Sequence, residues 1–367
     1  MTSLLVAFIS SFIATLLIIR FEYVHGHISG DNDLDGPQKF HEASVPRIGG
    51  IGIAIGVSLG ILIRFLFYPS PTIGITLLAC AMPVFAIGLL EDLTKKIGVK
   101  VRLLAVGILA GFASYYLGAQ ITRLDVVGID SLLLMPGVAF VFTIFAVTGL
   151  ANAYNIIDGF NGLSSMVAVI TLMGLSYVSY QMQDPLLIYL SLLMAAAILG
   201  FFLWNYPKGL IFLGDGGAYL IGFWVAIISI LLVTRHANVS PWFALLINAY
   251  PILETIFTMY RRKIHQGKNP GLPDGIHFHT LIYRRILAPT YSANSSFITA
   301  NSKTAPYLWL LTTLAVVPAI LMWDSTPLLI MSIFLFIVTY VWLYTKIVRF
   351  KTPRWMHPFK KNRPIKT

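Results

Sequence analysis

The sequence predicts an all-α fold: a polytopic transmembrane bundle of about eleven helices, with the N-terminus outside and the C-terminus in the cytoplasm. Of the 367 residues, 57% are hydrophobic and only 11% are charged, whereas soluble chains are usually about 25% charged. Apolar stretches long enough to cross roughly 30 Å of hydrocarbon as helices recur along the whole chain. Because no linker, repeat or low-complexity segment separates them, we expect a single transmembrane domain over 1–346 and a basic cytoplasmic tail over 347–367.

The apolar stretches place the helices near 1–19, 48–67, 73–90, 102–118, 137–153, 163–180, 186–204, 217–233, 241–260, 305–323 and 327–346. The first stretch has no basic residue before its apolar run, so we interpret it as a retained helix rather than a cleaved signal. With the N-terminus outside, every Lys and Arg except Arg64, Arg123 and Arg235 falls in a predicted cytoplasmic segment. Positive residues favour cytoplasmic loops, so this asymmetry supports the topology. It also explains the net charge of +11 without a nucleic-acid partner.

The predicted loops differ between the two faces of the membrane. Outside loops are short except for 119–137, whose alternating pattern predicts a small hairpin. The longest cytoplasmic loop covers 261–304, and loops beyond about 12–15 residues are usually functional or disordered. The basic tail is expected to lie against anionic lipid. The sequence therefore predicts that function resides on the cytoplasmic face.

Two adjacent carboxylates, Glu91 and Asp92, end the third predicted helix, and Lys100 follows in the next loop. Neighbouring carboxylates repel each other unless a cation or a proton lies between them. One member of such a pair can serve as a general base. A charged helix end with cytoplasmic lysines is the simpler explanation of the same residues.

Four polar residues recur at three-residue spacing in the stretch NAYNIIDGFNGL: Asn152, Asn155, Asp158 and Asn161. A buried Asp costs roughly 2.5–3.5 kcal/mol on membrane-insertion scales, so a partner must offset that cost. Steps of three residues keep the first three side chains on one side of a helix. Amide and carboxylate oxygens at a helix end suit a hard cation such as Mg²⁺. Hydrogen bonding between helices is the simpler alternative.

A third polar site lies in IFLGDGGAYLIGF, where Asp215 is surrounded by glycines just before an apolar run. Glycines at a helix N-terminus let backbone amides approach an anion. An aspartate there would repel phosphate unless a metal ion joined the two, so we interpret Asp215 as a metal ligand. A helix N-cap is the alternative.

The fourth site is LPDGIHFHTLIYRR in the long cytoplasmic loop, with His277, His279 and Arg284. Histidine and arginine side chains suit a pyrophosphate or a nucleotide. Glu254 is the one carboxylate that falls inside a predicted span, where it acts either as a proton relay or as a hydrogen-bonding group between helices.

Together these motifs resemble those of the polyprenyl-phosphate N-acetylhexosamine-1-phosphate transferases, a family that includes the muramoyl-pentapeptide transferase. DGPQKFHEASVPRIGG is similar to the family pattern D-x-P…K-x-H…P-x-x-G-G. NAYNIIDGFNGL is similar to N-x-x-N-x-x-D-G-x-[DN]-G-L, and FLGDGGA to F-x-G-D-x-G-[SA]. The likeness spans about residues 35 to 285 and includes the histidine loop.

The resemblance implies that a phosphate oxygen of undecaprenyl phosphate attacks a UDP-sugar at the sugar-proximal phosphorus, releasing UMP. It implies Mg²⁺, with Mn²⁺ as the alternative ion, held by Asn155 and Asp215. The carboxylates Glu91, Asp92 and Asp158 would be catalytic. Residues that contact sugar, nucleotide or phosphates would be Lys39, His41, Lys100, Asn152, Asn161, His277, His279 and Arg284. The protein would start O-antigen or another cell-envelope polysaccharide at the bacterial inner membrane.

Two positions depart from the usual family pattern: Glu91 replaces an Asp, and Thr280 replaces a His. The donor sugar, an N-acetylhexosamine or a 6-deoxy derivative, is left open, as is a homodimer. A secondary transporter of an anionic solute is the alternative function, because broken helices with polar groups would serve it. A catalytically inactive scaffold is a third.

Overall fold

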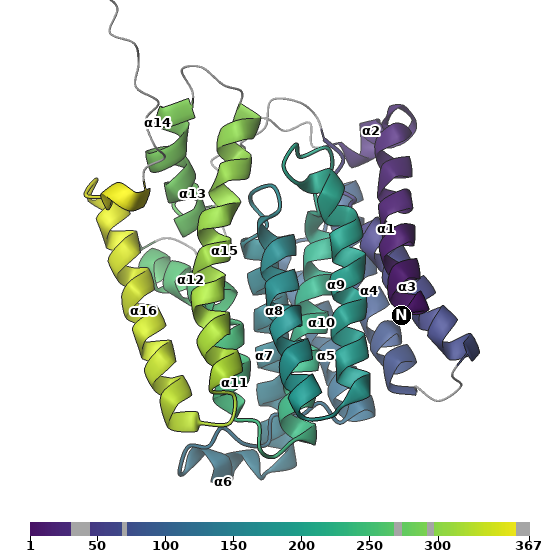
Figure 1. Ribbon diagram of the computed structural model, residues 1–367, viewed down its shortest axis with the longest axis vertical. Coiled ribbons are helices and arrows are strands. Elements are labelled where there is room, and N and C mark those ends of the chain that lie inside the picture. Colours follow the sequence, from purple (N-terminus) through teal and green to yellow (C-terminus); the bar gives the residue numbers. More distant parts are fainter. Residues whose placement is uncertain (31–44, 68–71, 268–273, 292–296, 357–367) are drawn as a thin grey trace, which may run out of the picture.

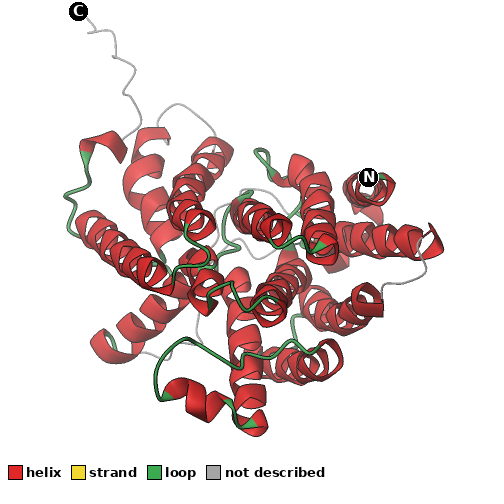
Figure 2. Cartoon of the chain, turned by 60° about the horizontal axis from the view of Figure 1, so that its bottom comes forward, coloured by secondary structure: helices red, strands yellow, loops and turns green. Residues whose placement is uncertain are grey.

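The computed structural model describes residues 1–30, 45–67, 72–267, 274–291 and 297–356 of the chain (Figure 1). Within these ranges the chain forms helices and loops, with an isolated β-bridge between Gly30 and Pro46 and no strand (Figure 2). Ten of the described helices are long and apolar enough to span a membrane, and the bent pair Pro241–Ile247 and Ala249–Ile264 makes eleven if it is counted as one span. The predicted all-α, polytopic bundle is confirmed.

The first half of the chain contains α1 Thr2–Arg20, α2 Glu22–Ser29, α3 Gly50–Phe67, α4 Thr72–Thr94, α5 Val99–Leu117, α6 Ile129–Leu133, α7 Pro136–Ile156 and α8 Leu163–Gln181. The second half contains α9 Pro185–Asn205, α10 Gly214–Arg235, α11 Pro241–Ile247, α12 Ala249–Tyr260, α13 Phe278–Ile282, α14 Ala288–Tyr291, α15 Phe297–Leu321 and α16 Thr326–Val348. Pro136, Pro185 and Pro241 occupy the first turns of their helices, where a missing N–H costs no intrahelical bond.

Helix α10 is the centre of the bundle, with 94% of its membrane-length window buried. It is apolar on every side, which is typical of a helix surrounded by protein, and it contacts α3, α4, α7, α8 and α9. Trp224, fully buried in α10, donates its indole N–H to the carbonyl of Leu190 in α9 at 3.1 Å. The position of α10, and of the residues at its N-terminus, is therefore fixed by packing on all sides.

The helix predicted over 241–260 is wrong as a single straight element. The chain breaks at Asn248, and the segments Pro241–Ile247 and Ala249–Ile264 meet at 75°. Pro251 explains the break, because its nitrogen cannot donate to the carbonyl of Ile247 and its ring would clash with that carbonyl in a continuous helix. The break turns α12 and its carboxylate, Glu254, toward the histidine loop.

The hairpin predicted over 119–137 is also wrong. The segment is extended chain followed by the short helix α6, and it lies across one end of the bundle (Figure 1). Side chains satisfy its backbone in place of a partner strand: Thr143 Oγ1 accepts from the amide of Ile121 at 2.9 Å, and Trp242 donates to the carbonyl of Leu124 at 2.8 Å.

The connections from α7 to α8 and from α9 to α10, helices α13 and α14, and the C-terminal end of α16 lie at the end of the bundle opposite α6 (Figure 1). These are segments that the predicted topology places on one face of the membrane. The side of the membrane to which this end belongs stays a prediction.

Candidate active site

The N-terminus of α10 carries Asp215 in a tightly packed setting. Gly214 has φ +76°, and a Cβ there would lie 2.0 Å from the carbonyl oxygen of Arg47 and 2.7 Å from Asp92 Oδ2. Only glycine meets both constraints without strain. A Cβ on Gly88 in α4 would lie 2.6 Å from the Cα of Gly216, so glycines also allow α4 and α10 to approach closely.

The anion bound at this helix N-terminus is the carboxylate of Asp92. Its Oδ1 accepts from the amide of Asp215, and its Oδ2 accepts from the amide of Gly216, both at 2.9 Å. The first amides of a helix have no intrahelical partner, so Asp92, from α4, caps α10. The glycine-rich start of α10 therefore binds an anion that belongs to the protein itself.

Asp215 lies between an amide and two guanidinium groups. Asn155, at the end of α7, donates its Nδ2 to Asp215 Oδ1 at 2.9 Å. Arg102 of α5 forms an ion pair with Asp215 Oδ2, and Arg47 Nη2 lies 3.6 Å from Oδ1. Arg47 also lies 3.8 Å from Asp92. Two cations thus neutralise two carboxylates at one end of the bundle, which offsets much of their cost of burial.

Asp158 follows the C-terminal end of α7 and faces the same charges. Burial raises the pKa of Asp158 to about 7, and the positive charge of Arg47 opposes that shift. Part of its surface remains accessible, so a bound ligand can reach it. Asn152, two turns earlier in α7, accepts from Tyr219 Oη of α10 at 3.0 Å. Asn152 and Asn155 therefore both face α10, as their three-residue spacing on α7 predicts, and Asp158 lies just beyond the helix.

Asn161 is held in the loop that follows, and it is buried. Its backbone N–H donates to Asn301 Oδ1 at 3.0 Å, and its side-chain Nδ2 donates to the carbonyl of Pro207 at 3.1 Å. The neighbouring Gly162 amide donates to Asn205 Oδ1 at 2.6 Å. These bonds join the α7–α8 turn to the α9–α10 loop and to α15, so Asn161 supports the shape of the turn that carries Asp158.

The histidine loop contributes a second polar cluster beside this turn. His277 and His279 are buried and stack with ring centroids 5.1 Å apart. His279 Nε2 lies 3.1 Å from where a Cβ on Gly159 would be. Burial, helped by the charge of His277, lowers the pKa of His279 to about 3, although Glu254 and Asp274 oppose the shift. His279 is therefore neutral near pH 7 and offers hydrogen bonds rather than positive charge.

The remaining predicted residues lie apart from these clusters or outside the described ranges. Glu91 accepts from the amide of Ile97 at 2.6 Å in the turn after α4, so Glu91 and Asp92 serve different partners. Lys100 is exposed at the start of α5. Arg284 is exposed, and its Nη1 lies within 3.4 Å of the carbonyl of Gly275. Lys39 and His41 lie outside the described residues.

Asn155 and Asp215 are the residues that would hold a magnesium ion here, with substrate completing its shell. Among the described residues no group of three or more His, Cys, Asp or Glu side chains is arranged around one metal position. Mg²⁺ commonly takes one or two protein ligands and fills its shell with water and substrate phosphates. If the Asn155 amide were turned over, its oxygen would lie beside Asp215 Oδ1. The other carboxylate oxygen of Asp215, Oδ2, pairs with Arg102.

Three residues of the site, Arg47, Arg102 and Asn301, were missed by the sequence reasoning. Arg102 lies at the edge of a predicted cytoplasmic segment whose basic residues were explained by topology alone. Arg47 lies in the VPRIGG stretch of the first motif, where an arginine beside glycines was the available signal. Asn301 comes from α15 and carried no signal, because its role depends on how α15 packs on α8.

Comparison with known proteins places the chain in a family. The family model of glycosyl transferase family 4 matches residues 74–233. A probable undecaprenyl-phosphate N-acetylglucosaminyl 1-phosphate transferase of Bacillus subtilis (strain 168) is 30% identical over 285 residues, 76% of this chain and 77% of the relative. The undecaprenyl-phosphate alpha-N-acetylglucosaminyl 1-phosphate transferase of Escherichia coli (strain K12) is 31% identical over 287 residues, 75% of each chain.

A phospho-N-acetylmuramoyl-pentapeptide-transferase of Streptococcus thermophilus (strain ATCC BAA-250 / LMG 18311) is 27% identical over 303 residues, 76% of this chain and 87% of the relative. The resemblance inferred from the motifs is thereby confirmed over most of the chain. The protein belongs to glycosyl transferase family 4, the family of polyprenyl-phosphate sugar-1-phosphate transferases.

Proposed function

We propose that this phosphotransferase moves a sugar-1-phosphate from a UDP-sugar to undecaprenyl phosphate, releasing UMP and forming undecaprenyl-diphosphate-sugar. The observation that carries the proposal is the meeting of Asp92, Asn155 and Asp215, from three helices, within hydrogen-bond distance at one end of the bundle. Relatives named for this reaction with N-acetylglucosamine cover three quarters of the chain. An N-acetylhexosamine is therefore the donor sugar that we test first.

In the proposed reaction, an oxygen of the lipid phosphate attacks the sugar-proximal phosphorus of the UDP-sugar. The bond from that phosphorus to the bridging oxygen breaks, and UMP leaves with the bond's electron pair. Phosphoryl transfer depends mainly on positioning and charge neutralisation. Arg47 and Arg102, two cations beside Asp215, are placed to neutralise phosphate charge.

The other residues bind and orient the substrates. Asp215 and Asn155 would hold Mg²⁺, which when bound neutralises charge on the pyrophosphate. Asp158, part-exposed beside Gly159, would contact sugar or nucleotide together with the neutral His279. Asp92 would act mainly through Asp215, since both of its oxygens are occupied by helix amides.

The apolar spans support a multi-pass membrane location, and the proposed acceptor lipid is consistent with the bacterial inner membrane. The predicted topology, with almost all Lys and Arg on one face, supports an active site in the cytoplasm. The product would start O-antigen or another cell-envelope polysaccharide.

The test is UMP release by purified protein supplied with undecaprenyl phosphate, Mg²⁺ and a panel of UDP-N-acetylhexosamines and their 6-deoxy derivatives. We expect release with one donor, lost when lipid or metal is omitted. Release that does not depend on the lipid, or no release with any donor from folded protein, would contradict the proposal. The transporter alternative predicts solute uptake into proteoliposomes without UMP.

A further inference from the structure

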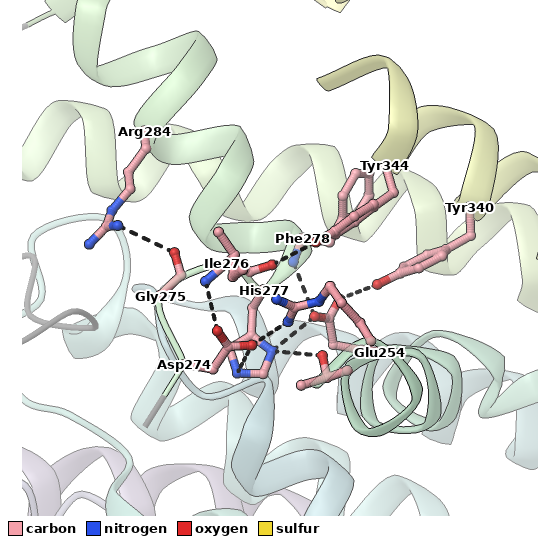
Figure 3. A network of polar contacts seen from close by, with 11 residues as sticks. Glu254, Asp274, Gly275, Ile276, His277, Phe278, Arg284, Tyr340 and Tyr344 are labelled. Atoms are coloured by element: carbon pink, nitrogen blue, oxygen red, sulfur yellow. Dashed lines mark hydrogen bonds and ion pairs between the residues drawn. The ribbon is translucent and has the colours of Figure 1, made fainter. Parts of the chain in front are cut away.

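Glu254 is a fully buried carboxylate that joins three parts of the chain. Its Oε1 accepts from His277 Nδ1 and from the amide of Phe278, both at 3.1 Å. Its Oε2 accepts from Tyr340 Oη of α16 at 2.8 Å. Figure 3 shows this carboxylate on α12, between the start of α13 and the tyrosines of α16. Glu254 thus connects the second half of the broken span to the histidine loop.

His277 is oriented from two sides. Its Nδ1 faces Glu254 and also lies 3.2 Å from Thr258 Oγ1, while its Nε2 lies 4.0 Å from Asp274 Oδ2. Asp274 in turn pairs with Arg261, which directly follows α12. An ionised carboxylate only accepts hydrogen bonds, so Glu254 requires a proton on Nδ1 of His277. The ring of His277 is therefore fixed in both position and protonation at Nδ1.

His279 lies between the oriented ring of His277 and the turn that carries Asp158 and Gly159. The two rings stack at an interplanar angle of 12°, and His279 meets Phe160 edge-on at 5.6 Å. His279 Nε2 lies against Gly159, beside Asp158. Its Nδ1 is buried and has no hydrogen-bond partner among the described residues.

A carboxylate is a costly way to fill this position if packing alone were required. Burying a charge is unfavourable, and an apolar residue of similar size is often as stabilising as a buried ion pair. Glu254 supplies instead what an apolar residue lacks, two acceptor oxygens that specify where three donors lie. This arrangement indicates that Glu254 positions the three groups that donate to it.

We propose that Glu254 is a positioning residue for the donor half of the site: it holds His277 and the first turn of α13, and thereby keeps His279 against the Asp158–Gly159 turn where the nucleotide sugar binds. This inference rests on the proposed function, because it assigns the histidine loop to the UDP-sugar rather than to the lipid. Glu254 does not touch substrate in this scheme. Hydrogen bonding alone explains the contacts of Glu254, so the proton relay that a transporter would require is not needed here.

The test compares Glu254→Ala, Glu254→Gln and wild type in steady-state kinetics with each substrate varied in turn. Glu254→Ala should raise KM for the UDP-sugar by about tenfold or more, the effect of losing hydrogen bonds to a charged group, and should leave KM for undecaprenyl phosphate within about twofold. Glu254→Gln should fall between, since its amide oxygen still accepts from His277 and Phe278. Thr255→Val, the next residue in α12, is the matched control, because its hydroxyl bonds only Pro251 O in its own helix; it should change neither KM.

Hydrogen–deuterium exchange without substrate separates this inference from the proposed function. Glu254→Ala should speed exchange in peptides covering 274–287 and leave peptides of α10 unchanged. Should wild-type protein release no UMP, the proposed function fails while exchange still tests the positioning role. An active Glu254→Ala variant with an unchanged KM for the UDP-sugar, or with unchanged exchange over 274–287, would overturn the inference. A lower maximal rate with both KM values unchanged would overturn it as well, because a residue that positions the UDP-sugar site should change the KM for that substrate.

Discussion

Asp92 and Asp215 are joined through the backbone: the Asp92 carboxylate accepts from the amide of Asp215 and from that of the next residue, each at 2.9 Å. The side chain of Asp92, from α4, thus caps α10, the helix whose first turn carries Asp215. The partial positive charge at a helix N-terminus stabilises an anion placed there. The orientation of the Asp215 side chain toward Asn155 and Arg102 therefore depends on α4 as well as on α10.

Replacing Asp92 by Asn should destabilise the protein and impair activity together. An amide offers one oxygen and turns its NH₂ toward a helix N–H, so one of the two capping bonds is lost and a donor faces a donor. The loss should be about 1–3 kcal/mol, seen as a lower midpoint of thermal unfolding in detergent. Glu91→Gln is the matched control, because Glu91 bonds only the nearby amide of Ile97. An Asp92→Asn protein as stable as Glu91→Gln would contradict the capping role.

Replacing Gly159 by Ala should lower activity without unfolding the protein. The added Cβ would lie 3.1 Å from His279 Nε2, so the ring must shift by a few tenths of an ångström. Small displacements of substrate-positioning groups are costly, and we expect kcat/KM for the UDP-sugar to fall by about tenfold. Gly149→Ala provides the control on α7, because a Cβ there meets nothing within 4 Å. Equal kcat/KM values for the two variants would show that His279 and Gly159 need not be in close contact.

Most of the fold could be predicted from the sequence, because the length of an apolar stretch determines whether it spans a membrane. Ten of the eleven predicted helices correspond to single long apolar helices, and the one over 241–260 corresponds to the bent pair α11 and α12. Hydropathy carries no information about the direction of the backbone, however. The apolar pattern therefore predicted α11 and α12 as one helix and missed the 75° bend between them. Pro251 was visible in the sequence and was the available signal.

The residue types of the site could be predicted, but not their bonds. Asp92 and Asp215 are 123 residues apart in the chain, and their contact follows from the close packing of α4 on α10 through Gly88 and Gly216. Periodicity within one helix carries no information about such packing. For the same reason, adjacency of Glu91 and Asp92 suggested a carboxylate pair, whereas successive residues of a helix point about 100° apart and these two meet different partners.

Asp184 should make the stability of the protein depend on pH at the end of the bundle opposite Asp215. It caps α9 by accepting from the amides of Leu186 and Leu187 and pairs with Arg235 and His236. Burial alone raises the pKa of Asp184, but the hydrogen bonds from Arg235, Leu187 and His236 outweigh it, and the net pKa lies below the usual value. Its contribution is therefore present above the unfolded pKa of about 3.9 and is lost as the pH falls through the lower folded value.

Asp184→Asn should accordingly lower the unfolding midpoint at pH 7, by an amount equivalent to about 1–2 kcal/mol. The difference from wild type should shrink as the pH is lowered toward 3, because wild type then loses the charge that the variant already lacks. Thermal unfolding in one detergent between pH 3 and 7 measures this. A difference that is constant with pH would mean that the carboxylate acts by shape rather than by charge.

Replacing Asp215 by Asn should abolish turnover while the protein stays folded in the membrane. Asparagine keeps the shape of the side chain and an oxygen for Asn155 Nδ2, but it loses the charge that pairs with Arg102 and that would hold Mg²⁺. UMP release should fall about 100-fold or more.

In wild type, Mg²⁺ added with UDP should raise the unfolding midpoint, because a ligand that binds only the folded state stabilises it. Asp215→Asn should not respond, whereas Asp184→Asn, which removes a buried carboxylate at the other end, should respond like wild type. Full activity in Asp215→Asn, or an unchanged response to Mg²⁺, would defeat the assignment of Asp215 as a metal ligand and leave its ion pair with Arg102 as its main role.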